Sequence, residues 1–130
     1  MKFDIDNLAR SLQKACPRAV FALLHGSAKN GEIRQGSDLD IAVYLDEKPD
    51  LEIYQILSEA VEKAVNSARP DIGFLNGAEP VYRFEALTGK LLFCRDRESY
   101  VSFFSLTCRE YESQLADYGR QRQYRLEYNS

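Results

Sequence analysis

The chain has 130 residues, of which 45% are hydrophobic and 28% charged, and its net charge is −3. This length suits one domain and is short for two, and the ordinary composition argues against a disordered or fibrous protein. Acidic residues slightly outnumber basic ones, so the chain lacks the surplus of basic residues that is typical of nucleic-acid binders. We therefore expect no direct nucleic-acid binding. We therefore predict a single domain over residues 1–130.

The first half of the chain predicts a helix and then two strands. Apolar residues at helical spacing indicate a helix over residues 3–15. The continuous apolar run 19–24 is typical of a strand buried on both faces, and residues 39–45 read as a second strand. Between the strands, residues 25–37 are polar and glycine-rich, which predicts a loop with room for a short helix after Ser27.

The second half alternates helices with short strands. Asp50 is the expected N-cap of a helix whose apolar stripe runs from Tyr54 to Val65. A third strand over 71–75, a brief helix over 80–88 and a fourth strand over 90–94 follow.

Asp96 then caps a long final helix, and its expected apolar stripe is Val101, Phe104, Cys108, Tyr111, Leu115 and Tyr118. The whole pattern predicts an α/β (α+β) fold: a small mixed sheet flanked by helices, with a long C-terminal helix.

The cysteines and the N-terminus bear on the compartment. Cys16, Cys94 and Cys108 are widely spaced and include no C-x-x-C pair, which disfavours a disulfide framework or a zinc site. No apolar run approaches membrane-spanning length, and the first residues lack the core of a signal peptide. We expect a cytoplasmic protein with reduced cysteines and no membrane contact.

Three aspartates lie at the edges of predicted strands. Asp38 and Asp40 are two residues apart, so on an extended strand both side chains point to the same face. Carboxylates forced together repel each other unless a cation lies between them, and such hard oxygen ligands suit magnesium (Mg²⁺) or manganese (Mn²⁺). If the strand of Asp71 lies alongside, its carboxylate completes a two-metal site for phosphoryl displacement.

Gly26 and Ser27 directly follow the first strand. A glycine at such a turn lets a phosphate approach the backbone, whose N–H groups can bind it together with the serine hydroxyl. Lys29 is a further candidate for phosphate contact, although a solvated loop charge is the simpler reading. One half of the loop therefore suits phosphate oxygens and the other half suits the metal ions that bridge them.

Gly26-Ser27, ten further residues and then Asp38-Leu39-Asp40 form the pattern G-S-x10-D-x-D. This pattern resembles the signature of minimal nucleotidyltransferases in the DNA polymerase beta-like superfamily, and the likeness extends over the whole chain. The resemblance implies a polymerase beta-like nucleotidyltransferase fold. It also implies an antitoxin of a HEPN/MNT (type VII) toxin–antitoxin pair, with a HEPN-domain ribonuclease toxin as its partner in a hetero-oligomer.

The resemblance also implies specific roles. Asp38 and Asp40 would hold two magnesium ions, and Asp71 would bind the metal nearer the attacking hydroxyl and help to activate it. Gly26 and Ser27 would hold the terminal phosphates of ATP, which leave as pyrophosphate. The implied reaction is AMPylation, the transfer of AMP from ATP onto a tyrosine of the toxin.

Two departures from the family pattern affect how the triphosphate is contacted. Asn30 stands where many relatives have an arginine, with Lys29 beside it, and His25 stands where many have an aromatic residue. His25 itself is either a strand-end residue or a contact to phosphate or base.

Two other functions stay open. A non-catalytic antitoxin would neutralise the toxin by binding and occlusion, and a third possibility is nucleotidyl transfer to a small-molecule hydroxyl such as that of an antibiotic. The short length disfavours the last, because an extra helical domain usually holds such an acceptor. The Arg- and Tyr-rich C-terminal tail, with Arg120, Arg122 and Arg125, reads as a protein-docking or frayed helix end.

Overall fold

Helices and strands alternate along the chain in the computed structural model, which describes residues 2–34, 36–66 and 68–128. In order, the elements are α1 (Ile5–Ala15), β1 (Ala19–His25), the short 3₁₀ helix η1 (Gly26–Ala28), β2 (Asp38–Leu45), α2 (Leu51–Ala64), β3 (Arg69–Phe74), α3 (Pro80–Leu87), β4 (Lys90–Cys94) and α4 (Arg97–Tyr128). Aspartates cap three of the helices: Asp4, Asp50 and Asp96 each accept backbone N–H groups of the first turn. No described helix is both long and apolar enough to cross a membrane.

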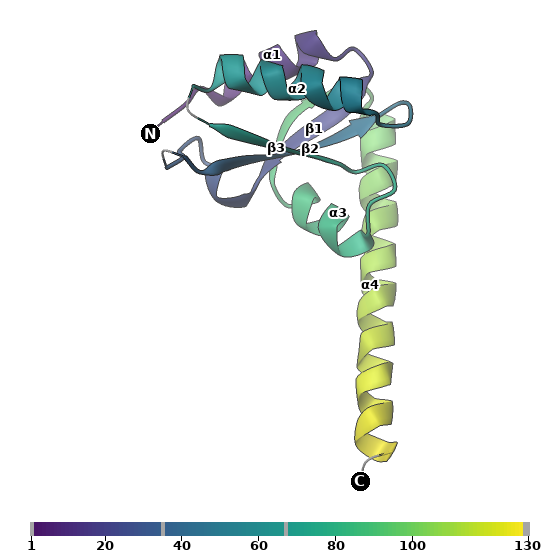
Figure 1. Cartoon of the computed structure of the whole chain (residues 1–130). Coiled ribbons are helices and arrows are strands. Elements are labelled where there is room, and N and C mark those ends of the chain that lie inside the picture. Colours follow the sequence, from purple (N-terminus) through teal and green to yellow (C-terminus); the bar gives the residue numbers. More distant parts are fainter. Residues whose placement is uncertain (1, 35, 67, 129–130) are drawn as a thin grey trace.

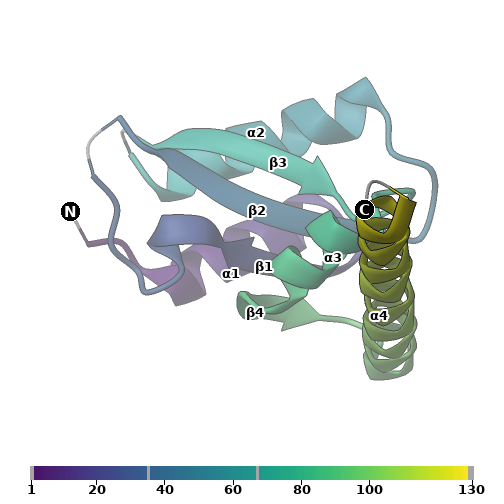
Figure 2. The same ribbon diagram turned by 90° about the horizontal axis from the view of Figure 1, so that it is seen from below.

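The described residues form a four-stranded sheet in the order β3-β2-β1-β4. β1 pairs antiparallel with β2 and β4, whereas β2 and β3 are parallel because α2 carries the chain back between them. α1 and α2 cover one face of the sheet, and α3 with the beginning of α4 lies on the other (Figures 1 and 2). This mixed sheet, with its flanking helices and long C-terminal helix, confirms the predicted fold class.

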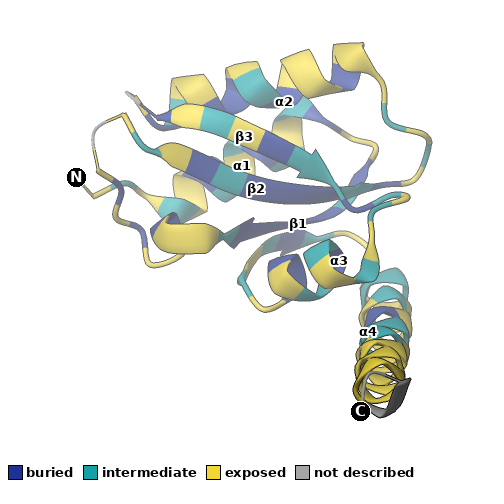
Figure 3. Ribbon diagram, turned by 60° about the horizontal axis from the view of Figure 1, so that its bottom comes forward, coloured by how far each residue is buried: buried dark blue, intermediate teal, exposed yellow. Residues whose placement is uncertain are grey.

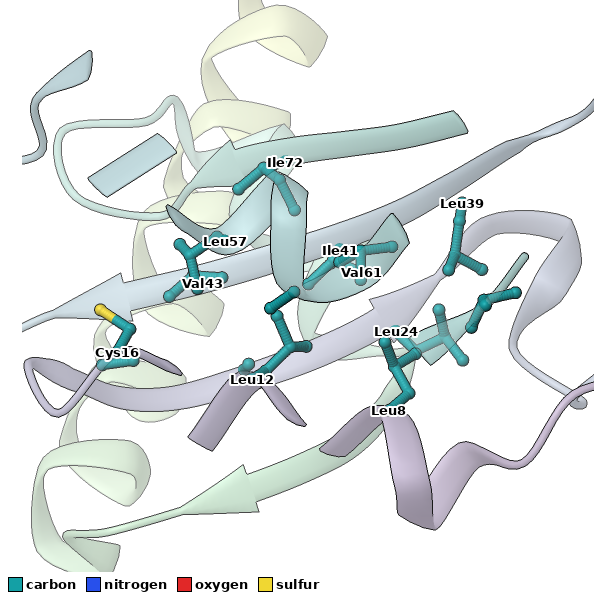
Figure 4. Packing of buried hydrophobic residues seen from close by; sticks show 14 of the residues in the cluster. Leu8, Leu12, Cys16, Leu24, Leu39, Ile41, Val43, Leu57, Val61 and Ile72 are labelled. Atoms are coloured by element: carbon teal, nitrogen blue, oxygen red, sulfur yellow. The ribbon is translucent and has the colours of Figure 1, made fainter. Parts of the chain in front are cut away.

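The larger core lies between the sheet and the pair α1 and α2. Figure 4 shows Leu8 and Leu12 of α1 and Leu57 and Val61 of α2 facing Ile41 of β2. All five side chains are fully buried, and burying each stabilises the fold by about 1.5–3 kcal/mol. Leu57, Val61 and Val65 of the expected stripe of α2 are buried, and only its first member differs, because Ile53 is buried and Tyr54 is exposed.

A smaller core lies on the opposite face, under α3 and α4. Phe21 of β1 is its centre, with ring contacts to Tyr44, Tyr100 and Phe103. Arg83 of α3, only 8% exposed, forms an ion pair with Glu110 of α4 and lies over the Phe103 ring. These contacts fasten the first half of α4 to the domain.

The second half of α4 projects away from the domain (Figure 1), and almost all of its described residues are exposed (Figure 3). The prediction that the apolar stripe is the buried face of this helix is therefore wrong. The helix packs instead through Phe103 and the fully buried Thr107, whereas Leu115 and Tyr118 are 51% and 57% exposed. Arg120 of the predicted tail forms an exposed ion pair with Asp117 of the same helix.

Candidate functional site

The three predicted aspartates lie at one corner of the sheet, on the face that carries α3. In the parallel pairing of β2 with β3, Asp40 is the direct partner of Asp71, and Asp38 is the partner of Arg69. Since side chains two residues apart on a strand share a face, Asp38 lies on the same face as both other carboxylates. We call Asp38, Asp40 and Asp71 the acidic corner. The register of β2 and β3 creates the acidic corner, which contains all three aspartates that the sequence analysis selected as candidate metal ligands.

The predicted Gly26 lies directly against the acidic corner. His25 is the antiparallel partner of Asp40, so the chain leaves β1 beside that carboxylate. Gly26 has a positive φ of 77°, and a Cβ there would overlap the Oδ2 atom of Asp40. Glycine is therefore required both by the backbone conformation and by the close approach.

Ser27 and Lys29 are exposed at the start and the end of the turn that follows. Ser27 lines a polar groove of about 510 Å³ together with Glu32, Ile33, Arg34 and Ser37. Lys29 is not among the residues that line this groove. The structure therefore brings Ser27 together with the loop that leads into β2, whereas it gives Lys29 no contact with the corner.

The electrostatics of the corner centre on Asp40. Partial burial raises the pKa of Asp40 from its ordinary value, and a side-chain hydrogen bond with Asp71 raises it further. The charges of Asp71 and Asp38 act in the same direction, while His25 opposes them. Two carboxylates at hydrogen-bond distance need either a shared proton or a cation between them, and their oxygens are of the type that binds hard cations.

Asp40 and Asp71, two of the three carboxylates, lie close enough together to bind one divalent cation between them. Asp38 is turned to Arg69 instead, with 3.3 Å between Oδ1 and the arginine Nε. In the described part of the chain, no three His, Cys, Asp or Glu side chains converge closely enough to hold a metal ion. The donor set of carboxylate oxygens nevertheless suits Mg²⁺ or Mn²⁺, and Asp38 shares the face of the other two.

Tyr82 of α3 borders the corner and was missed by the sequence analysis. Its hydroxyl lies over Gly73 of β3, where a Cβ would collide with it, and its ring meets the edge of His25 at a centroid distance of 5.8 Å. Burial raises the pKa of Tyr82, and the charges of Asp71 and Asp40 raise it further, so the hydroxyl stays protonated. The available signal was Gly73, because a glycine inside a strand marks a close approach.

Carboxylates on two adjacent strands are the type of ligand that a metal-assisted phosphoryl-transfer site uses. A family model described as polymerase beta, nucleotidyltransferase matches residues 6–98 of this chain. The chain therefore belongs to the polymerase beta nucleotidyltransferase family. A comparison with curated protein sequences found no match.

Solved structures give the same fold at low sequence identity. A chain from the toxin–antitoxin complex MntA–HpeT with a double Asp-to-Glu mutation is 20% identical, with a TM-score of 0.76 over 95% of this chain and 98% of that one. A chain from a toxin–antitoxin complex with AMP-PNP is 21% identical, with a TM-score of 0.74 over 95% and 98%. A third, from a tri-AMPylated HEPN toxin of Shewanella oneidensis in complex with MNT antitoxin, is 20% identical, with a TM-score of 0.70 over 94% and 95%.

Proposed function

We propose that this protein is the antitoxin of a HEPN/MNT toxin–antitoxin pair and a magnesium-dependent adenylyltransferase acting on a tyrosine of its toxin. The observation that carries the proposal is the in-register pairing of Asp40 with Asp71, with Gly26 against Asp40. The family membership adds the reaction class, and the similar structures named above add the type of partner. The free cysteines Cys16, Cys94 and Cys108 suit the cytoplasm as the location.

The proposed reaction exchanges one phosphate bond for another. The toxin's tyrosine oxygen attacks the α-phosphorus of ATP, the bond from that phosphorus to the oxygen bridging to the β-phosphate breaks, and pyrophosphate leaves. Asp71 accepts the proton of the attacking hydroxyl. Asp38, Asp40 and Asp71 would hold divalent cations, which supply charge stabilisation for the attacking and leaving oxygens. Gly26 and Ser27 would lie along the terminal phosphates.

The outer half of α4 supports a protein acceptor rather than a small one. Leu115, Tyr118 and Leu126 are between 51% and 68% exposed and lie along one side of a helix that projects from the domain. Exposed apolar residues at helical spacing are typical of a surface that another protein covers. We assign this surface to the toxin, which would bring its tyrosine to the acidic corner.

The test uses the purified protein, the HEPN protein encoded beside it, ATP and magnesium. We expect intact-mass spectrometry to show the toxin gaining the mass of AMP, and peptide sequencing to place it on tyrosine. Asp38→Asn combined with Asp40→Asn should abolish the transfer, since it removes both charges while it keeps the shapes. Asp46→Asn is the matched control, because Asp46 is an exposed carboxylate just beyond the other end of β2.

The pairing of Asp38 with Arg69 favours a second candidate, a non-catalytic antitoxin that acts by occlusion. The same experiment separates the two functions when toxin ribonuclease activity is assayed in parallel. Neutralisation without any AMP transfer, equal in the wild type and the double variant, would leave occlusion as the function.

A further inference from the structure

Arg69 is the one described cation that forms an ion pair with the acidic corner. It is the first residue of β3 and the direct partner of Asp38, so it lies on the same face as Asp71, two residues further along. Its side chain is 72% exposed, and that of Asp38 is 55% exposed. The Arg69 side chain is therefore free to change partners without disturbing the core.

The charge balance at the corner changes when ligands enter. Without a cation, Arg69 is a positive charge that offsets the repulsion among the three carboxylates. When a divalent cation binds Asp38, the cation takes over that role and competes directly with the guanidinium. With a nucleoside triphosphate also present, the phosphates and carboxylates together outweigh two divalent cations, so the filled site still needs positive charge beside it.

We propose that Arg69 is a positioning residue with two successive partners: Asp38 in the empty site, and a phosphate of the bound nucleotide in the filled one. The inference rests on the proposed nucleotidyl-transfer function and adds to it a residue that the sequence pattern did not select. A guanidinium suits both partners, because its planar fork donates to carboxylate and phosphate oxygens alike. In the structure Asp38 pairs with Arg69, and the three carboxylates do not converge on one point.

This exchange predicts effects of opposite sign on two ligands. Removing the guanidinium frees Asp38, so a divalent cation alone should bind more tightly. Removing it also takes a donor from the nucleotide, so the cation–nucleotide complex should bind more weakly. A residue that merely supports the fold would change both affinities in the same direction.

The experiment measures binding rather than turnover. Mn²⁺ binding is followed through the electron paramagnetic resonance signal of the free ion, and binding of AMP-PNP with magnesium is followed by calorimetry. In Arg69→Gln, we expect Mn²⁺ to bind about two- to fivefold more tightly, as for loss of an exposed ion pair. The same variant should bind AMP-PNP roughly tenfold more weakly, as for loss of a charge-assisted hydrogen bond.

Two further variants complete the design. Arg69→Lys keeps the charge without the fork, so Mn²⁺ affinity should stay near the wild-type value while AMP-PNP affinity falls part of the way. Arg10→Gln, an exposed arginine of α1 on the other face of the sheet, is the matched control and should change neither affinity.

The outcomes separate this inference from the function on which it rests. If the wild type binds both ligands and Arg69→Gln binds them equally well, or loses affinity for both, the two-partner role of Arg69 is wrong and the proposed function stands. If the wild type binds neither Mn²⁺ nor AMP-PNP, the proposed catalytic function fails, and the role of Arg69 fails with it.

Discussion

The acidic corner gathers carboxylates, whereas the outer half of α4 exposes apolar side chains, and the two features have different origins. At the corner, Asp40 and Asp71 lie side by side because the register of two strands holds them there. On α4, Leu115 and Tyr118 lie in solvent because the helix continues past the last element that could cover it. The domain itself enforces the first arrangement, whereas the second leaves apolar side chains that we propose the toxin covers.

The two features depend on different parts of the fold. A site set by strand register is present in the isolated domain, since a one-residue slip would turn every side chain of the strand to the other face. A projecting helix of 32 residues, about 48 Å long, gains little stability from its own sequence beyond the packed half. Changes at the corner should therefore affect chemistry and domain stability, and changes on outer α4 should affect binding alone.

The largest expected effect tests the α4 side of this contrast. If outer α4 is the proposed toxin-binding surface, Leu115→Glu with Tyr118→Glu should weaken toxin binding by more than about 100-fold, because the substitutions place charge in an apolar interface. The melting temperature should hardly change, since both residues are exposed. Biolayer interferometry and thermal unfolding check the two halves of the prediction.

Ser113→Glu with Ala116→Glu is the matched control, because it adds the same charge to exposed residues elsewhere around the helix. Equal toxin affinity in both double variants would show that outer α4 is not the binding surface.

The next effect concerns the joint between α4 and the domain. Arg83→Met removes the ion pair with Glu110 and the contact with the Phe103 ring. We expect the free energy of unfolding to fall by about 1–3 kcal/mol, because half-exposed Glu110 loses its partner. Urea denaturation measures the loss. Adding Glu110→Leu should recover most of the lost stability, since an apolar pair can replace a buried ion pair. If the double variant recovers none, the loss does not come from leaving Glu110 without its partner.

A smaller effect tests the packing at the corner. Gly73→Ala places a Cβ against the Tyr82 hydroxyl, so the tyrosine must move. We expect a loss of about 1–2 kcal/mol, as for overpacking. Tyr82→Phe removes the colliding oxygen and should restore part of the loss in the double variant. Additive losses in chemical denaturation would show that Tyr82 does not lie over Gly73 in solution.

The smallest effect concerns pH. Burial and the hydrogen bond with Asp71 raise the pKa of Asp40, so the folded state holds that proton more tightly than the unfolded chain does. The stability contributed by Asp40 is therefore full below its unfolded pKa and is lost as pH rises through the folded value. Asp40→Asn removes this loss and should raise the melting temperature at neutral pH by about 1–3 °C. The difference from wild type should vanish in acid, and Asp46→Asn should show no such trend.

The sequence predicted the fold and most of the corner because these depend on local signals. The apolar runs at 19–24 and 39–45 identified the central strands, and the spacing of Asp38 and Asp40 put both carboxylates on one face. The sequence analysis placed Asp71 beside the other two carboxylates on the condition that its strand lies alongside, and β3 does pair with β2, with Asp71 opposite Asp40.

Other features were beyond the sequence because they depend on contacts between distant elements. Tyr82 meets the corner only because α3 packs on the sheet against β1, which brings the tyrosine hydroxyl to Gly73, and nothing in its local sequence distinguishes it from other helical tyrosines. Arg69 pairs with Asp38 only through strand register. For α4, apolar periodicity predicted the helix but not the face that packs, because that face includes the polar Thr107, whereas Val101, Phe104 and Leu115 of the apolar stripe are exposed.

The position of Pro70 has a consequence for association. β3 is an edge strand, and the N–H groups of Arg69 and Leu75 donate toward β2, so the alternation directs the Pro70 nitrogen to the open edge. An incoming strand would find no N–H donor there, and it would meet the charged Arg69 and Asp71 on either side. The segment of β3 that supplies Asp71 to the acidic corner thus also protects the sheet against edge-to-edge aggregation.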